Sequence, residues 1–222
     1  MNDVKVILTN DGSKTLQMPK LNEQYHSVHG AVKEAEHVFI KNGLRECKQN
    51  TLTIFEMGFG TALNAFMTYL ESKKSSQHIR YYAIEKHPLP LHIVESLEYP
   101  KHLSATDDEE IFTLFHTADW NTALMLSPTF ELQKIYDTIQ NMSIDVKVDL
   151  VYYDAFGPRV QPELWSEQIF VKLASMMKPN ATLVTYCAKG EVKRILKRLG
   201  FVVETLPGPP GKREMIRAKW VK

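Results

Sequence analysis

Two glycines lie in the segment Glu56-Met57-Gly58-Phe59-Gly60-Thr61-Ala62-Leu63-Asn64, which follows a run of apolar residues. Glycines let a backbone turn sharply and let a ligand approach it closely. A dinucleotide-binding loop needs a third small residue at the position of Leu63, and the Gly-Lys-Ser/Thr of a P-loop is missing. The segment therefore predicts another kind of ligand-binding turn, with a tight turn that binds nothing as the alternative.

Acidic residues stand after the predicted strands. Glu56 precedes the first glycine by two residues, as in enzymes that use S-adenosylmethionine, where it would face the ammonium end of the cofactor. Glu85 ends the second strand, where a carboxylate can accept hydrogen bonds from ribose hydroxyls. Asp119 and Trp120 follow the third, where an acid can accept from an adenine amino group and a ring can pack on the base. One such acid is usually solvated, but three in register favour an adenosine site.

Asp154 ends the fourth predicted strand and is followed by Ala155-Phe156-Gly157-Pro158. An amine of pKa near 10 is mostly protonated at neutral pH, yet it attacks a sulfonium methyl group through its lone pair. Asp154 and the adjacent carbonyls can orient such an amine and accept its hydrogens, with most of the rate gain coming from in-line positioning. The alternative is a helix cap or an acid that binds only the cofactor.

The elements that must position these residues alternate between strands and helices. Strands are predicted at 4–8, 14–18, 52–55, 80–84, 111–116, 149–153, 181–186, 201–206 and 214–220, and helices at 30–42, 63–70 and 192–199. This alternation predicts a mostly parallel sheet with helices on both faces. Ligands of such sheets bind beyond the carboxyl ends of the strands, where the strand order reverses.

Charge is concentrated near the end of the sequence. The net charge is +1, but residues 186–222 contain ten Lys or Arg against three Glu, a balance of +7. A basic region of this kind can contact phosphate. The candidate RNA-binding residues are Lys189, Lys193, Arg194, Lys212 and Arg213. A solvated helix face is the alternative.

Composition narrows the remaining possibilities. No apolar run approaches the ~20 residues of a membrane span, and the first residues do not resemble a secretory signal. Cys47 and Cys187 belong to no paired motif, and the eight histidines are scattered. We therefore expect a cytoplasmic protein without a membrane segment or a metal site.

Several segments carry a resemblance to a known family. They are Tyr25-His26-Ser27, Gly30-Ala31 with Glu34, His37-Val38-Phe39, residues 56–64, Asp154-Ala155-Phe156 with Pro158, Pro162-Glu163-Leu164-Trp165, residues 185–190, and residues 207–215. With them the chain resembles the methyltransferase domain of the tRNA 5-methylaminomethyl-2-thiouridine enzymes, MnmC and its stand-alone MnmD-like relatives. The match covers nearly the whole chain from residue 25. Ala62 departs from it, because the family usually has a third glycine there.

The resemblance implies a Rossmann-like class I methyltransferase with a seven-stranded, mostly parallel sheet. Residues 1–29 would form a β-hairpin extension and residues 30–222 the methyltransferase domain. It implies S-adenosylmethionine-dependent methylation of the aminomethyl group of a wobble uridine in tRNA. Another enzyme would supply that aminomethyl group, because the flavin oxidase domain of the bifunctional relatives is not expected here. A monomer is compatible with these features.

The resemblance also implies roles for individual residues. Asp154 and Phe156 would lie at the methyl group and the acceptor amine. The cofactor would contact Tyr25, Ser27, Glu56, Gly58, Gly60, Thr61, Glu85, Asp119, Trp120 and Asp154. Two alternatives stay open: methylation of a small-molecule or protein amine, and a non-catalytic RNA-binding module on the same fold.

Overall fold

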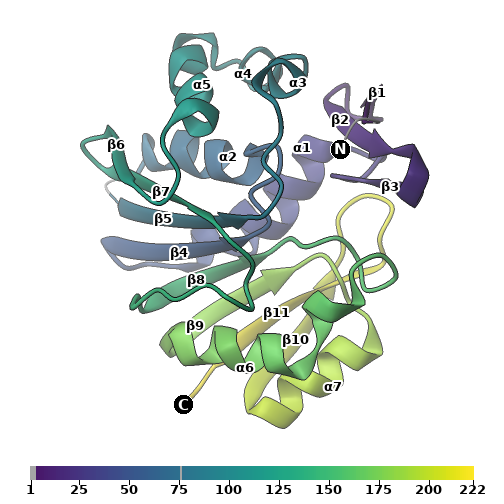
Figure 1. Ribbon diagram of the computed structural model, residues 1–222. Coiled ribbons are helices and arrows are strands. Elements are labelled where there is room, and N and C mark those ends of the chain that lie inside the picture. Colours follow the sequence, from purple (N-terminus) through teal and green to yellow (C-terminus); the bar gives the residue numbers. More distant parts are fainter. Residues whose placement is uncertain (1–3, 76) are drawn as a thin grey trace.

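An eight-stranded sheet forms the centre of the molecule in the computed structural model, which describes residues 4–75 and 77–222 (Figure 1). Its order is β10-β11-β9-β8-β4-β5-β7-β6. The strands are β4 (Thr51–Met57), β5 (His78–Glu85), β6 (Ala123–Ser127), β7 (Phe130–Tyr136), β8 (Val148–Tyr153), β9 (Met177–Thr185), β10 (Phe201–Pro207) and β11 (Glu214–Trp220). Strands β7, β5, β4, β8 and β9 run parallel, whereas β6, β10 and β11 pair antiparallel. The expected Rossmann-like α/β class is confirmed.

Helices cover both faces of this sheet, because neighbouring residues of its central strands point to opposite sides. Ile54 packs into one apolar cluster and Phe55 into the other. The first face is covered by α1 (Ala31–Ala35) with its π-helical continuation Glu36–Lys41, α2 (Leu63–Ser72), α3 (Leu91–Glu95), α4 (Tyr99–His102) and α5 (Glu109–Thr117). The second is covered by α6 (Glu167–Met176) and α7 (Gly190–Leu199). Short 3-10 turns occupy Pro19–Leu21, Leu44–Glu46, Thr106–Asp108 and Pro162–Trp165.

A small antiparallel sheet precedes this core. It contains β1 (Lys5–Leu8), β2 (Lys14–Met18) and β3 (Glu23–Gln24), in that order. The hairpin expected from residues 4–8 and 14–18 is confirmed, and β3 adds a third strand to it. Tyr25 directly follows β3, and its N–H donates to the Leu16 carbonyl at 2.9 Å. The small sheet therefore positions the segment that leads into the site.

The strand expected at residues 111–116 is wrong, because these residues lie in α5. Glu109 and Glu110 occupy the first turn, where acidic side chains stabilise a helix. Phe112 and Phe115 lie three residues apart on one helical face and are buried. The third parallel strand is instead β7, and the additional strand β6 pairs with it, which makes eight strands rather than seven.

Candidate active site

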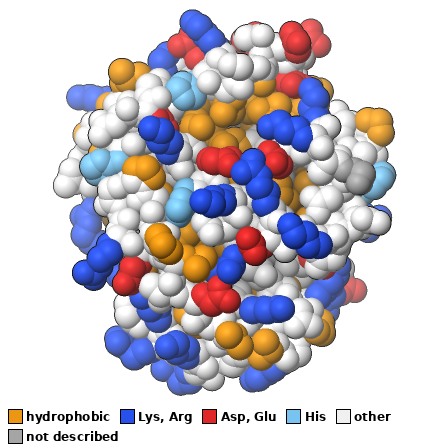
Figure 2. Space-filling view, turned by 180° about the vertical axis from the view of Figure 1, so that it is seen from behind, with side chains coloured by type: hydrophobic (Ala, Val, Ile, Leu, Met, Phe, Trp, Pro, Cys, Tyr) orange, Lys and Arg blue, Asp and Glu red, His pale blue; other side chains and the backbone are white. Residues whose placement is uncertain are grey.

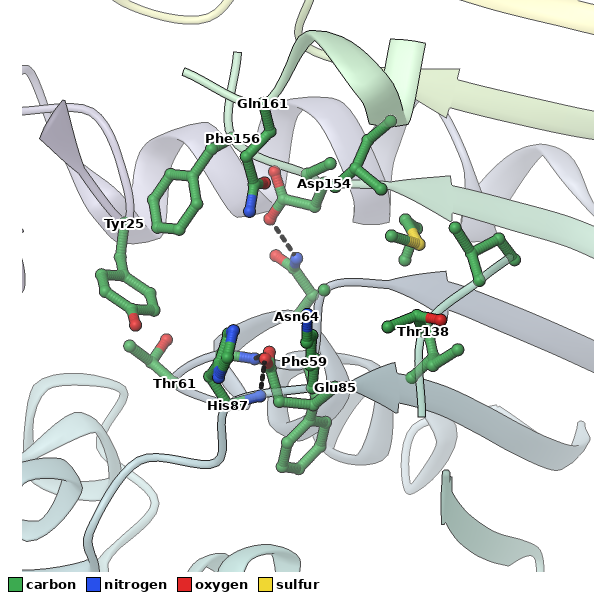
Figure 3. A pocket seen from close by; sticks show the side chains of 18 of the residues that line it. Tyr25, Phe59, Thr61, Asn64, Glu85, His87, Thr138, Asp154, Phe156 and Gln161 are labelled. Carbon is green, nitrogen blue, oxygen red and sulfur yellow. Dashed lines mark hydrogen bonds between the residues drawn. The ribbon is translucent and has the colours of Figure 1, made fainter. Parts of the chain in front are cut away.

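A cavity of about 410 Å³ opens at the carboxyl ends of the parallel strands (Figure 3). Residues that follow β4, β5, β7 and β8 line it, together with Tyr25, His26 and part of the segment 161–164. Strand β4 lies between β5 on one side and β8 on the other. The cavity therefore sits where strand order reverses, the usual place for a ligand in an open α/β sheet.

The glycine turn forms one wall of this cavity. Gly58 and Gly60 have φ angles of +91° and +49°, which side chains rarely adopt. A Cβ at Gly58 would lie 3.0 Å from the Asp154 carbonyl oxygen, and one at Gly60 would lie 3.2 Å from the Tyr25 ring. The absent side chains thus let the end of β4 approach both the loop after β8 and the segment after β3.

Glu85 lies at the end of β5 with its carboxylate fixed by backbone donors. Gly60 N–H donates to Oε2 at 3.1 Å, and His87 N–H donates to Oε1 at 2.8 Å. Each carboxylate oxygen keeps acceptor capacity after one such bond. Glu85 can therefore accept further hydrogen bonds from hydroxyl groups of a ligand in the cavity.

Asn64, in the first turn of α2, links two carboxyl groups. Its Nδ2 donates to Glu56 Oε1 at 3.0 Å and to Asp154 Oδ2 at 2.8 Å (Figure 3 shows the second bond). Its own Oδ1 is buried and has no hydrogen-bond partner among the described residues. Glu56 is fully buried and is absent from the lining of the cavity. Glu56 therefore holds the Asn64 amide through a hydrogen bond from outside the cavity, whereas Asn64 and Asp154 line the cavity.

The protonation of these two carboxyl groups follows from their surroundings. Burial raises the pKa of Glu56 well above its usual value, and the Asn64 hydrogen bond opposes that rise only in part. Burial also raises the pKa of Asp154, with a further contribution from the charge of Glu34. The Asn64 amide and the Lys212 ammonium oppose this rise. A carboxyl group with a raised pKa is a better proton acceptor once it ionises.

The loop after β8 is held by two hydrogen bonds to its carbonyls. Trp165 Nε1 donates to the Phe156 carbonyl at 2.7 Å, and the Tyr186 hydroxyl donates to the Ala155 carbonyl at 2.8 Å. The Phe156 ring meets the Tyr25 ring edge to face, with centroids 5.1 Å apart. Asp154 and Phe156 thus form a fixed polar and aromatic end of the cavity.

The structure brings many of the predicted cofactor residues together, but not all of them. The cavity is lined by Tyr25, Gly58, Gly60, Thr61, Glu85, Asp154 and Phe156. Ser27, Glu56, Asp119 and Trp120 are absent from its lining. Ser27 N–H bonds Glu34 at 2.8 Å instead. Asp119 follows a helix rather than the third strand, and its side chain is exposed.

Sequence reasoning missed several residues that line the cavity. Asp137 follows β7 and so holds the place that had been assigned to Asp119. Apolar residues alternate with polar ones through much of β7, and this pattern could have identified the strand. Asn64 and His26 lie in the family-like segments 56–64 and 25–27, but no role was predicted for them. Gln161 directly precedes the segment 162–165.

The predicted basic residues divide into two groups. Lys189, Lys212 and Arg213 line a second, shallow hollow that also contains Tyr186. Lys193 pairs with Glu214 at 2.7 Å and Arg194 pairs with Glu191 at 2.6 Å. Seen from behind, Lys and Arg side chains gather along the lower edge, where Figure 1 places α7 and the C-terminal end (Figure 2). Because the Tyr186 hydroxyl bonds Ala155, the shallow hollow adjoins the loop after β8.

Lys212 has an additional structural role. Its ammonium group lies 3.8 Å from the centroid of the Tyr186 ring and pairs with the buried carboxylate of Glu34.

Within residues 4–75 and 77–222, no helix is long and apolar enough to cross a membrane. In the same residues, no three His, Cys, Asp or Glu side chains are grouped to hold a metal ion.

Comparison with known proteins identifies the class. Residues 125–220 match a family described as S-adenosyl-L-methionine-dependent methyltransferase. The tRNA 5-methylaminomethyl-2-thiouridine biosynthesis bifunctional protein MnmC of Burkholderia multivorans is 30% identical over 220 residues, covering 91% of this chain and 33% of the relative. The protein of the same name from Cupriavidus metallidurans is 32% identical over 230 residues, covering 96% and 33%. The chain thus spans about a third of the length of these curated relatives.

A solved structure agrees with the fold. The crystal structure of MNMC2 from Aquifex aeolicus superimposes with a TM-score of 0.74 at 22% identity, covering 98% of this chain and 70% of that one. Fold, cavity and family match together define an S-adenosylmethionine-dependent methyltransferase. Within that class, the chain is similar to the MnmC proteins of Burkholderia multivorans and Cupriavidus metallidurans over 91% and 96% of its own length.

Proposed function

We propose that this protein methylates the nitrogen of a 5-aminomethyl group on a wobble uridine of tRNA. The observation that carries the proposal is the meeting of Asp154, Asn64 and Phe156 at one end of the cavity. This end offers a carboxyl group and an aromatic ring, which suit an amine carried on a flat base. The relatives named for tRNA 5-methylaminomethyl-2-thiouridine biosynthesis support that acceptor.

The cavity suits S-adenosylmethionine in three respects. Gly58 and Gly60 leave the wall free of side chains, Glu85 retains acceptor capacity for ribose hydroxyls, and the buried Asn64 Oδ1 lacks a partner among the described residues. We assign the ribose to Glu85 and the adenine to the segment around Asp137. The amino-acid part would lie near Gly58 and Asn64. When bound, the cofactor supplies an electrophilic methyl group on a sulfonium.

Asp154 then has one task, which is to hold the acceptor amine with its lone pair toward that methyl group. Its carboxylate accepts hydrogen bonds from the amine. The raised pKa of Asp154 also makes this carboxylate a better proton acceptor. Asn64 holds Oδ2, so the other oxygen is available to the amine. The fixed loop around Phe156 places the base, and positioning of this kind supplies most of the rate.

The shallow hollow beside Tyr186 extends the proposal to the RNA backbone. Lys189 and Arg213 are exposed there, and the Arg213 side chain is 93% accessible. Two exposed cations next to the acceptor loop suit phosphates that flank the wobble base. Lys212 is tied to Glu34, so we assign it to the architecture of the site rather than to the RNA.

Asp154→Asn tests the function and the mechanism together. We expect methyl transfer to hypomodified tRNA to fall by about 10²-fold or more, while cofactor affinity falls much less. Single-turnover transfer from labelled cofactor, mass spectrometry of the nucleosides and a binding titration give the three readouts. Asp145→Asn, at an exposed site, is the matched control. Near-normal transfer would remove Asp154 from the mechanism, and equal losses of binding and transfer would make it a cofactor ligand.

A further inference from the structure

Two hydrogen bonds fix the backbone of Gln161, whereas its side chain is not held in this way. Its N–H donates to the Gly157 carbonyl at 3.1 Å, and its carbonyl accepts from Leu164 N–H at 3.1 Å. The residue lines the cavity and is half-buried, yet its side-chain amide has no hydrogen-bond partner within the part of the chain that the structure describes. Figure 3 shows this amide pointing into the cavity, toward Asp154. Such a half-buried amide is in place to bond a ligand.

The acceptor proposed above has a hydrogen-bonding edge that complements this amide. In a 5-aminomethyluracil, the carbonyl at C4 neighbours the substituted carbon, and the N3–H comes next. With the aminomethyl group at Asp154, the base therefore presents first an acceptor and then a donor. A glutamine amide presents a donor and an acceptor side by side. We infer that Gln161 reads the imide edge of the acceptor uracil, with Nε2 donating to O4 and Oε1 accepting from N3–H, an inference that rests on the proposed function.

Asp154 determines which end of the Gln161 amide faces O4 of the base. A carboxylate accepts hydrogen bonds and repels a carbonyl oxygen, so the amide turns its NH2 end toward Asp154. The carbonyl end then lies on the far side, where uracil places its N3–H. Cytosine has the reverse order, with an amino donor at C4 and an acceptor at N3. Gln161 therefore selects uracil over cytosine as the base that carries the amine.

The aromatic residues supply the remaining contact. Phe156 lines the same end of the cavity, and Trp165 fixes its backbone through a 2.7 Å hydrogen bond to the carbonyl. A base that stacks on such a ring has its edge free for the amide. Stacking accepts any base, because every base has a π face. Discrimination between pyrimidines thus falls to Gln161.

A double-mutant cycle across protein and substrate tests the inference. The substrates are anticodon stem–loop RNAs with 5-aminomethyluridine or its N3-methyl analogue at the wobble position. In the unsubstituted protein, N3-methylation should lower kcat/KM about 10- to 100-fold, the range of a two-bond base contact. Gln161→Leu should lower kcat/KM on the first RNA by a similar factor, and N3-methylation should then cost little more. Full additivity of the two losses would overturn the inference.

Two further measurements separate this result from a general defect. Cofactor affinity of Gln161→Leu, measured by calorimetry, should stay within about twofold. Gln168→Leu, at an exposed position on α6, should behave as the unsubstituted protein on both RNAs. If the unsubstituted protein transfers no methyl group to either RNA, the proposed function fails and this inference with it. If it is active but the losses add, only the role of Gln161 fails.

Discussion

Asn64 Nδ2 lies 2.8 Å from Asp154 Oδ2, so the first turn of α2 fixes the carboxyl group that follows β8. The two residues are 90 positions apart in sequence. The same amide group reaches the buried Glu56, which leaves Asn64 little freedom to rotate. The orientation of the proposed catalytic carboxylate is therefore set by a neighbouring helix and not by its own loop alone.

Asn64→Leu should weaken the chemical step through Asp154. The Asn64 hydrogen bond lowers the pKa of Asp154, so its loss raises that pKa further and favours the protonated acid. The reaction needs the carboxylate, and we therefore expect the acidic limb of the kcat profile to move to higher pH. At neutral pH, kcat should fall about tenfold, with a smaller change in KM for tRNA. Asn50→Leu, at an exposed site, is the control, and an unshifted pH profile would contradict a positioning role.

Gly58→Ala should impair both stability and cofactor binding. Its φ of +91° disfavours any side chain, at a cost of roughly 1–2 kcal/mol. The new Cβ would press on the Asp154 carbonyl oxygen at 3.0 Å and displace the loop after β8. Thermal unfolding and calorimetric titration with S-adenosylmethionine measure the two effects.

A suitable control for that variant is Gly190→Ala. Its Cβ would meet the flexible guanidinium group of Arg194 at 3.3 Å, which can move aside. We expect cofactor affinity to fall at least tenfold for Gly58→Ala and to be unchanged for Gly190→Ala. Equal affinities in the two variants would remove Gly58 from the binding site.

The double variant Lys189→Ala/Arg213→Ala should reduce the salt dependence of tRNA binding. Each lost phosphate contact lowers the slope of log affinity against log salt by about 0.7–0.9, so the pair should lower it by roughly 1.5. Lys5→Ala/Lys41→Ala removes two exposed charges elsewhere and should leave the slope unchanged. A slope that is the same in all three proteins would make the shallow hollow a solvated surface.

His26 should make the fold sensitive to acid. Burial lowers its pKa from 6.5 to about 4, and its Nε2 is 2.8 Å from Thr61 Oγ1. Between pH 6.5 and 4 the unfolded chain binds a proton that the folded chain excludes, so stability falls as pH falls. By pH 5 this loss is about 2 kcal/mol. His26→Gln should flatten unfolding free energy against pH between 7 and 5, whereas exposed His92→Gln should not. Parallel curves for His26→Gln and the unsubstituted protein would contradict this.

Local patterns in the sequence predicted most of the elements and the position of the glycine turn. These local patterns failed where contacts with another helix or strand determine the local structure or the position of a side chain. Ile111–His116 has the composition of a strand, but the packing of Phe112 and Phe115 against Phe66 makes it a helix. Because of that error, Asp119 was expected after the third strand, whereas Asp137 is the acidic residue that follows β7. The spacing of residues along the chain likewise could not show that Asn64 joins Glu56 to Asp154, because the contact forms only when α2, β4 and β8 are assembled.

Strand β11 is inserted between β9 and β10, although both of these precede it in sequence. During synthesis on the ribosome, β9 therefore has an unpaired edge until residues 214–220 emerge. An open strand edge is a template for wrong pairing with other chains. After proteolysis between β10 and β11, residues 214–220 would be held in the finished protein only by noncovalent contacts, among them the pairing of β11 with β9 and β10. The edge of β9 would be exposed again if that C-terminal segment left the sheet.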